Sequence, residues 1–238
     1  MKIGLISDVH GNFAALKQVI IELRRGGAEM ILNAGDNVGY SPKPDECVSL
    51  LKDENVQGCM GNYDEAAAFG RPECGCGDSC NADLMKMRAL SLRWTQANIS
   101  EETRKYLSML PKTLEIVAGE CGILVIHGGI GALNNWITEN DADKMEKISG
   151  QTGADIIIMG HTHIPFVRKL KGRTFINPGS VGRPIDNDPR ASYALLDTAG
   201  AGVELRRAGY DVEDNIGSLI TAGLPADIGF ALRNGKEI

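Results

Sequence analysis

Hydrophobic residues in the first sixty positions follow two alternating arrangements. Short and nearly continuous apolar runs, typical of buried strands, occur at Lys2–Ser7, Met30–Asn33 and Val56–Met60. Between these runs, Asn12 is a suitable N-cap for a helix that extends to about Arg25, and Asp45–Lys52 has a second helical pattern. The order strand–helix–strand–helix–strand predicts a largely parallel sheet covered by helices.

The rest of the chain continues as a mixture of strands and helices. Helices are expected at Asn81–Ala97, Glu101–Met109, near Asp141–Gln151 and in most of the last thirty residues, which we expect to be peripheral. Strands are expected at Ile123–His127, Ile156–Met159, Ser192–Asp197 and Val203–Arg207, with a hairpin formed by Phe166–Lys171 and Arg173–Asn177. Phe69–Ser79, rich in Gly and Cys, is expected to be a loop. No repeat or long linker divides the chain, so we expect one α/β domain over residues 1–238.

The composition is that of an ordinary globular protein, with 43% hydrophobic and 24% charged residues. The net charge of −6 argues against non-specific nucleic-acid binding, which requires many basic residues. No apolar stretch approaches the length of a membrane span. Asp8 and His10 interrupt the N-terminal apolar run too early for a secretory signal, so we expect a cytoplasmic protein whose six cysteines are reduced.

The polar residues whose side chains are suited to metal binding or catalysis lie where predicted strands end. Asp8, Asp36 and Asn62 each follow a predicted strand of the first half, and all four histidines lie after or near the end of a strand. In parallel sheets, sites form at the carboxyl ends of the strands. We therefore expect these side chains to gather along one edge.

The types of side chain in this group indicate a transition-metal site. Imidazole together with carboxylate suits Mn, Fe, Zn, Ni or Co better than Ca or Mg alone. The expected ligands are too many for one ion and suit two; they are Asp8, His10, Asp36, Asn62, His127, His161 and His163.

Five motifs occur in a fixed order: Asp8-Val9-His10, Gly35-Asp36, Gly61-Asn62-Tyr63-Asp64, an isolated His127 and Gly160-His161-Thr162-His163. In order and spacing, from about residue 3 to 210, they resemble the calcineurin-like metallophosphoesterases. The segments DVHGN, GDNVGYSPKP, GHTHIPF and NPGSVGRP are most similar to the small bacterial phosphodiesterase branch of that family. The resemblance implies a sandwich of two mixed β-sheets flanked by helices.

The resemblance also implies roles for individual residues. One metal would be held by Asp8, His10, Asp36 and His163, and the other by Asp36, Asn62, His127 and His161, with Asp36 bridging. A hydroxide shared by the metals would attack a phosphodiester or phosphomonoester of a small molecule or nucleotide. Asp36, Tyr63 and Asp64 are the expected catalytic residues, and Asn12, Asn37 and Arg183 the candidate phosphate contacts.

One departure from the family pattern affects the expected substrate. Tyr63 stands where many relatives have His, and a phenol with a pKa of about 10 is a weaker acid than an imidazolium. Phosphates with poor leaving groups, such as simple alkyl phosphates, are therefore less expected as substrates.

Two other functions remain open at this point. Some members of the same branch resemble dinucleoside tetraphosphate hydrolases, and a retromer subunit of this fold is a non-catalytic platform for proteins. The seven intact ligand positions argue against the second of these. Cys74, Cys76 and Cys80 lie in the loop that precedes a predicted helix, and they form either a plain or redox-sensitive loop or a further metal site.

Overall fold

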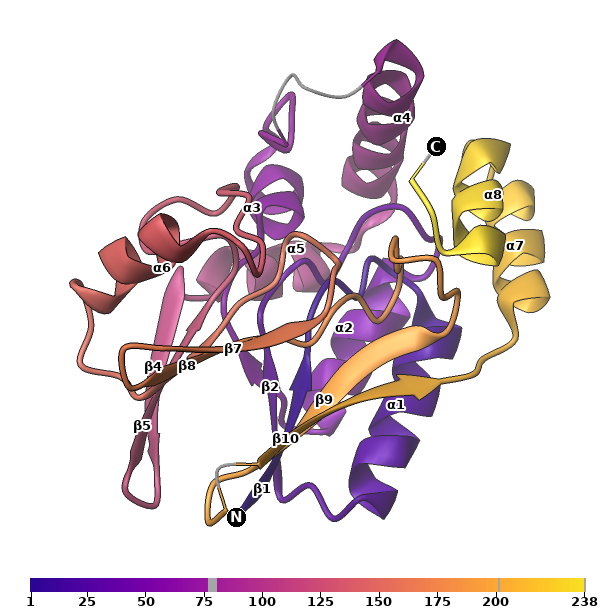
Figure 1. Ribbon diagram of the computed structural model, residues 1–238. Coiled ribbons are helices and arrows are strands. Elements are labelled where there is room, and N and C mark those ends of the chain that lie inside the picture. The colour runs from indigo at the N-terminus through magenta and orange to yellow at the C-terminus, as the bar shows by residue number, and fades with distance from the viewer. Residues whose placement is uncertain (77–80, 201, 238) are drawn as a thin grey trace.

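Two five-stranded sheets form the centre of the computed structural model, which describes residues 1–76, 81–200 and 202–237 (Figure 1). In spatial order, the first sheet contains β10 (Gly202–Ala208), β9 (Ala191–Asp197), β1 (Lys2–Ile6), β2 (Met30–Asn33) and β3 (Gln57–Gly58). The second sheet contains β4 (Thr113–Ala118), β5 (Cys121–Ile126), β6 (Ile156–Ile158), β8 (Arg173–Asn177) and β7 (Phe166–Leu170).

Both sheets are mixed. In the first, β1, β2 and β3 are parallel, whereas β9 and β10 are antiparallel to their neighbours. In the second, β5, β6 and β8 are parallel, and β4 and β7 add antiparallel edges. The predicted parallel arrangement is therefore correct for the three strands of the first sixty residues, and the predicted α/β sandwich of two mixed sheets is confirmed.

Alternating residues of each strand belong to two hydrophobic layers, as strand periodicity requires. Ile3 and Leu5 of β1 pack between the sheets against Ile158 and other residues of the second sheet. Ile6 contributes instead to the layer under α1 (Phe13–Arg25) and α2 (Pro44–Asp53), which cover the outer face of the first sheet. On the second sheet, α6 (Ala142–Ser149) packs on the outer face.

The remaining helices gather beside the ends of the strands where the expected ligands lie (Figure 1). They are α3 (Asn62–Phe69), α4 (Ala82–Asn98), α5 (Glu101–Met109), α7 (Val212–Thr221) and α8 (Ala226–Asn234). Residues of α3, α4, α7 and α8 share one hydrophobic cluster, so the C-terminal helices are packed onto the middle of the chain. Among the described residues, no helix combines the length and apolarity needed to cross a bilayer.

The N-cap predicted for α1 is present, because the side-chain Oδ1 of Asn12 accepts a hydrogen bond from Ala15 N at 3.2 Å. Three elements differ from the sequence-based expectation. The third strand is only two residues long, and α3 and β4 were not predicted. Almost every position of α3 is buried, so it lacks a polar face, and β4 is a half-buried edge strand.

Candidate metal centre

The loops that carry the expected ligands are joined by backbone hydrogen bonds at the carboxyl ends of β1, β2, β5 and β6. Asp8 N donates to Gly35 O at 2.9 Å, and His10 N donates to Asp36 O at 3.0 Å. In the second sheet, Gly160 N donates to His127 O at 3.0 Å. The expected gathering along one edge therefore occurs, and it involves both sheets.

Five of the expected ligands have a left-handed backbone conformation. Their φ angles lie between 49° and 69°, at Asp8, His10, Asp36, His161 and His163. Such angles are uncommon for residues other than glycine and cost about 1–3 kcal/mol each, and they concentrate at functional sites. The loops therefore turn sharply after each strand and direct these side chains inward.

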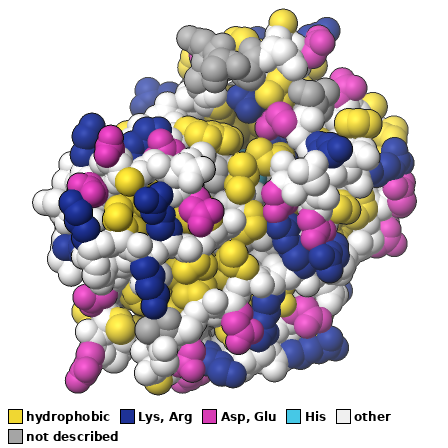
Figure 2. All heavy atoms as spheres, in the orientation of Figure 1, with side chains coloured by type: hydrophobic (Ala, Val, Ile, Leu, Met, Phe, Trp, Pro, Cys, Tyr) yellow, Lys and Arg dark blue, Asp and Glu magenta, His cyan; other side chains and the backbone are white. Residues whose placement is uncertain are grey.

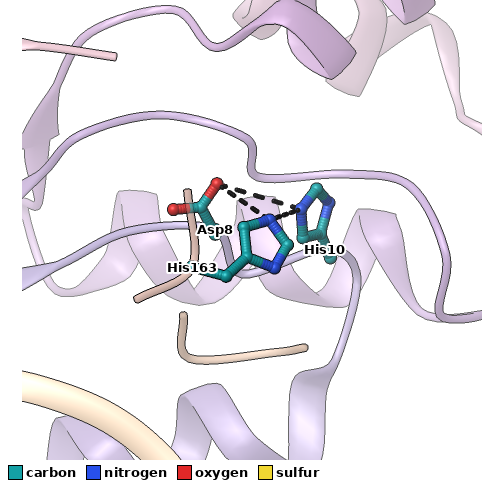
Figure 3. Close-up of side chains that lie close together, drawn as sticks. All are labelled: Asp8, His10 and His163. Atoms are coloured by element: carbon teal, nitrogen blue, oxygen red, sulfur yellow. Dashed lines mark hydrogen bonds and ion pairs between the residues drawn. The ribbon is translucent and has the colours of Figure 1, made fainter. Parts of the chain in front are cut away.

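Asp8, His10 and His163 converge closely (Figure 3). Asp8 Oδ1 lies 3.4 Å from His163 Nε2 and 3.9 Å from His10 Nε2, and the two Nε2 atoms are 3.1 Å apart. The Nδ1 atoms point away from this centre and bond to the backbone oxygens of Val38 and Arg183, at 3.1 and 2.7 Å. A neutral imidazole that donates through Nδ1 has a lone pair on Nε2.

Two lone pairs therefore face each other beside a buried carboxylate oxygen. Within the described residues (1–76, 81–200 and 202–237), no group forms a hydrogen bond with Asp8 Oδ1. Such a group of acceptors is unfavourable in a buried site unless a cation lies among them. The donor set thus fits a metal ion, and backbone carbonyls on the opposite ring nitrogens are the usual support for metal-binding histidines.

Asp36 and His127 form the core of an adjacent cluster with Asn62. His127 Nε2 is 3.4 Å from Asp36 Oδ2 and 2.9 Å from Asn62 Oδ1, while its Nδ1 bonds to Ala34 O at 2.7 Å. Asp36 Oδ2 also lies 3.7 Å from His10 Nε2, so this carboxylate lies between the two clusters.

His161 is supported differently from the other histidines. Its backbone N donates to Asp8 Oδ2 at 3.1 Å, and its ring packs edge-on against His127 and Trp136, with centroid distances of 5.1 and 5.7 Å. It is adjacent to the second cluster rather than within it.

Burial and charge control the protonation of these side chains. Burial lowers the pKa of His10 to about 4 and that of His161 to about 3, so both rings are neutral at pH 7, the state that binds metals. Burial opposes ionisation of Asp8 and Asp36, but the neighbouring histidines reverse this effect and lower the pKa of both carboxyl groups. Burial also lowers the pKa of His127, but Asp36 outweighs it and raises this pKa to about 9.

Asp64 and Asn37 lie behind the ligands. The buried Asp64 carboxylate accepts hydrogen bonds from Gly61 N, Asn37 N and Asn37 Nδ2, at 3.1, 2.8 and 2.8 Å. Asn37 Oδ1 accepts in turn from Asn33 Nδ2 at 2.7 Å. Burial and the nearby Asp36 raise the pKa of Asp64 to about 7. These bonds join the loops that hold Asp36 and Asn62.

Asn12 is also a buried structural residue in this molecule. Besides capping α1, its amide donates to Gly182 O at 2.9 Å and to the hydroxyl of Tyr210 at 3.1 Å. The side chain has no exposed surface, and the phosphate contact expected from the resemblance stays a prediction.

A cavity opens above four of the ligands, and its walls include residues of distant elements. Tyr63, Arg183 and Trp136 line it, as do Tyr40, Arg88 and Glu237, which the sequence did not single out as site residues. The Tyr63 hydroxyl is buried and has no hydrogen-bond partner in the described part of the chain. Figure 2 shows that almost no histidine surface is visible from this side.

Cys74 and Cys76 lie beside Asn62. Asn62 Nδ2 donates to Cys74 O at 3.0 Å and to Cys76 Sγ at 3.1 Å, and the two Sγ atoms are 2.6 Å apart. Both thiols are free, and Cys80 lies outside the described residues. These two cysteines therefore adjoin the candidate metal centre.

Two mixed sheets with carboxylate and imidazole side chains at their shared edge define a metallophosphoesterase fold. The model of the calcineurin-like phosphoesterase superfamily domain matches residues 1–201, and the chain belongs to this family.

Relatives with known sequence or structure agree with this assignment. The chain is 30% identical to an uncharacterised protein of Methanocaldococcus jannaschii over 98% of both chains. It is 24% identical to phosphodiesterase YfcE of Escherichia coli K12, covering 83% of this chain and 88% of YfcE. A metallophosphoesterase crystal structure from Sphaerobacter thermophilus is 29% identical, with a TM-score of 0.80, over 99% of this chain and 100% of the other.

Proposed function

We propose that the protein is a two-metal phosphoesterase that hydrolyses phosphodiester or phosphomonoester bonds of small molecules or nucleotides. The observation that supports this most strongly is the set of facing Nε2 lone pairs of His10 and His163 beside the unpartnered oxygen of Asp8. In this proposal, Asp8, His10, Asp36 and His163 hold one metal, and Asp36, Asn62, His127 and His161 hold the other.

The ligand chemistry favours Mn, Fe, Zn, Ni or Co ions. Bound there as a pair, such ions would acidify a water molecule and neutralise the charge of phosphoryl oxygens. The position of Asp36 Oδ2, within 3.7 Å of His10 Nε2 and 3.4 Å of His127 Nε2, supports its role as the shared ligand.

Other residues are proposed to position the ligands or the substrate. Asp64 orients the Gly61–Asn62 turn and Asn37 through its three hydrogen bonds, and Asn12 secures α1 at the same edge. Tyr63 donates a hydrogen bond to the leaving-group oxygen. Burial raises its pKa well above the usual value, so it keeps its proton, and esters with good leaving groups are the favoured substrates.

Hydrolysis of bis-p-nitrophenyl phosphate with added Mn²⁺ tests the proposal. Asp36→Asn is expected to lower kcat by roughly a thousand-fold or more, because it removes the charge shared by both metals. Asp227→Asn, an exposed aspartate in the first turn of α8, serves as the matched control and should retain full activity. Absence of phosphoester hydrolysis with every one of the five metals would instead favour a protein-binding scaffold.

A further inference from the structure

The wall of the cavity beyond the metal ligands contains a buried guanidinium group. Arg183 is only 2% exposed, and its Nη2 forms an ion pair with Glu237 Oε1. Its Nε is buried without a hydrogen-bond partner among the residues that the structure describes. A guanidinium has five donors in a planar fork, so the carboxylate leaves part of its capacity unused.

A second arginine lies on the other side of the same carboxylate. Arg88 of α4 has its Nη2 3.9 Å from Glu237 Oε2, and both residues line the cavity. Burial raises the pKa of Glu237, but Arg183 and the other cations outweigh this effect and lower it, so the side chain is ionised at neutral pH. Two guanidinium groups thus lie on either side of one carboxylate, and Arg88 Nη1 also donates a hydrogen bond to Cys76 O at 3.2 Å.

Tyr40 lies between the Arg183 guanidinium and the candidate metal ligand His10. Its ring packs edge-on against His10, with centroids 4.8 Å apart, and the Arg183 guanidinium carbon lies 4.4 Å from its centroid. One cavity therefore has metal ligands on one side of Tyr40 and cationic groups on the other. The metal ligands and Arg183 therefore offer two separate positions along the wall of one cavity.

Glu237 lies after the last helix, unlike the two arginines, which lie in the body of the chain. It follows α8 in a segment without regular structure, where Asn187 N donates to Gly235 O at 2.7 Å and Lys236 N donates to Ala231 O at 3.3 Å. Arg183 is fixed in a buried loop, and Arg88 lies within a helix of seventeen residues. Glu237 also lies outside residues 1–201, which match the family domain.

We infer that Arg183 and Arg88 form an anion subsite for a second phosphate group of the substrate, and that Glu237 occupies this subsite until the substrate displaces it. This rests on the proposed function and narrows its substrate class to phosphoesters with a further phosphate close to the scissile one. A phosphate carries up to two charges and pairs with both guanidinium groups, which a single carboxylate matches less well.

Binding of inorganic phosphate to the chelator-treated, metal-free protein tests the subsite without any catalysis. Calorimetric titration of Glu237→Gln should show at least about tenfold tighter phosphate binding than the unmodified protein, because the internal competitor has lost its charge. The control is Glu213→Gln, which makes the same charge change at an exposed ion pair between Glu213 of α7 and Arg233 of α8. This variant should bind phosphate with the affinity of the unmodified protein. Equal affinities for all three proteins, or no binding to any, would overturn the inference.

A matched pair of substrates provides a second measurement on the metal-loaded protein. The p-nitrophenyl ester of thymidine 5′-phosphate is compared with the same ester carrying an additional 3′-phosphate. The unmodified protein should prefer the second ester by about tenfold in kcat/KM. Arg183→Gln or, if that variant does not fold, Arg88→Gln should bring the ratio close to one.

The outcomes of the two measurements are distinguishable. A ratio near one in the unmodified protein contradicts the subsite even when both esters are hydrolysed. If neither ester is hydrolysed, the proposed function fails, while the phosphate titration still decides whether the subsite exists.

Discussion

The two sheets contribute different chemistry to the same edge. The loops that follow β1, β2 and β3 supply both carboxylates, the amide of Asn62 and one imidazole, whereas the loops that follow β5 and β6 supply only imidazoles. Asp36 lies within 4 Å of a histidine from each sheet, His10 and His127. Neither sheet alone carries all the proposed ligands, so the candidate centre depends on how the sheets pack.

The support of the histidines differs as well. His10, His127 and His163 are each fixed by a backbone oxygen on Nδ1, and for His127 that oxygen belongs to Ala34, after β2 of the opposite sheet. His161 instead relies on ring packing and a backbone contact. Of the four histidines, His161 is therefore the proposed ligand whose removal should disturb the surrounding structure least.

His161→Ala tests the contribution of the second sheet and should have the largest effect. Turnover should fall by roughly a thousand-fold or more, because a metal ligand is lost, while the circular-dichroism spectrum stays unchanged. Ile164→Ala, an exposed position on the same loop, is the control and should remain active. Full activity of His161→Ala would remove this residue from the ligand set.

Asp64→Asn tests the support of the first sheet. The amide cannot accept all three hydrogen bonds from Gly61 and Asn37, so Mn²⁺ affinity or turnover should fall by about 10–100-fold. The matched control is Asp155→Asn, which alters an aspartate that accepts from Gly122 N at the opposite end of β6. Equal Mn²⁺ titrations for the two variants would contradict a supporting role.

Gly160→Ala tests the junction between the sheets. A methyl group at this position would lie 2.0 Å from Ser7 Oγ and 2.9 Å from Asp8 Oδ2. We expect the free energy of unfolding to decrease by about 1–3 kcal/mol, as measured by urea denaturation. Gly153→Ala, which points into open space before β6, should be close to neutral. A loss below about 0.5 kcal/mol in Gly160→Ala would show that the junction tolerates the added methyl.

Tyr63→Phe should have the smallest effect of the series. The hydroxyl has no partner in the part of the chain described, so the free energy of unfolding should change by less than about 0.5 kcal/mol. Turnover of an aryl phosphodiester should fall by no more than about tenfold if the hydroxyl assists the leaving group. Unchanged kcat with both aryl and alkyl esters would exclude that role.

The sequence was most informative where local pattern and topology agree. Continuous apolar runs identified β1 and β2, and the rule that sites lie after parallel strands placed Asp8 and Asp36 together. It was less informative for α3, whose short Ala-rich segment has no polar face, and for the edge strand β4.

The residues around the ligands were harder to predict because their roles depend on tertiary contacts. Asn12 and Asn37 occur in family-like motifs, yet both side chains are used in hydrogen bonds within the protein. Glu237 reaches the cavity from a region that was expected to be peripheral. No spacing along the chain relates it to Arg183, since only the packing of the C-terminal helices brings them together.

The great separation of the ligands along the chain has a consequence for synthesis. His10 and His163 are 153 positions apart, yet their Nε2 atoms lie 3.1 Å from each other. A nascent chain therefore exposes the first of the proposed ligands long before the last ones leave the ribosome, and the candidate metal centre forms only after both sheets have assembled. Under the proposed function, hydrolytic competence is therefore expected only among the final events of folding.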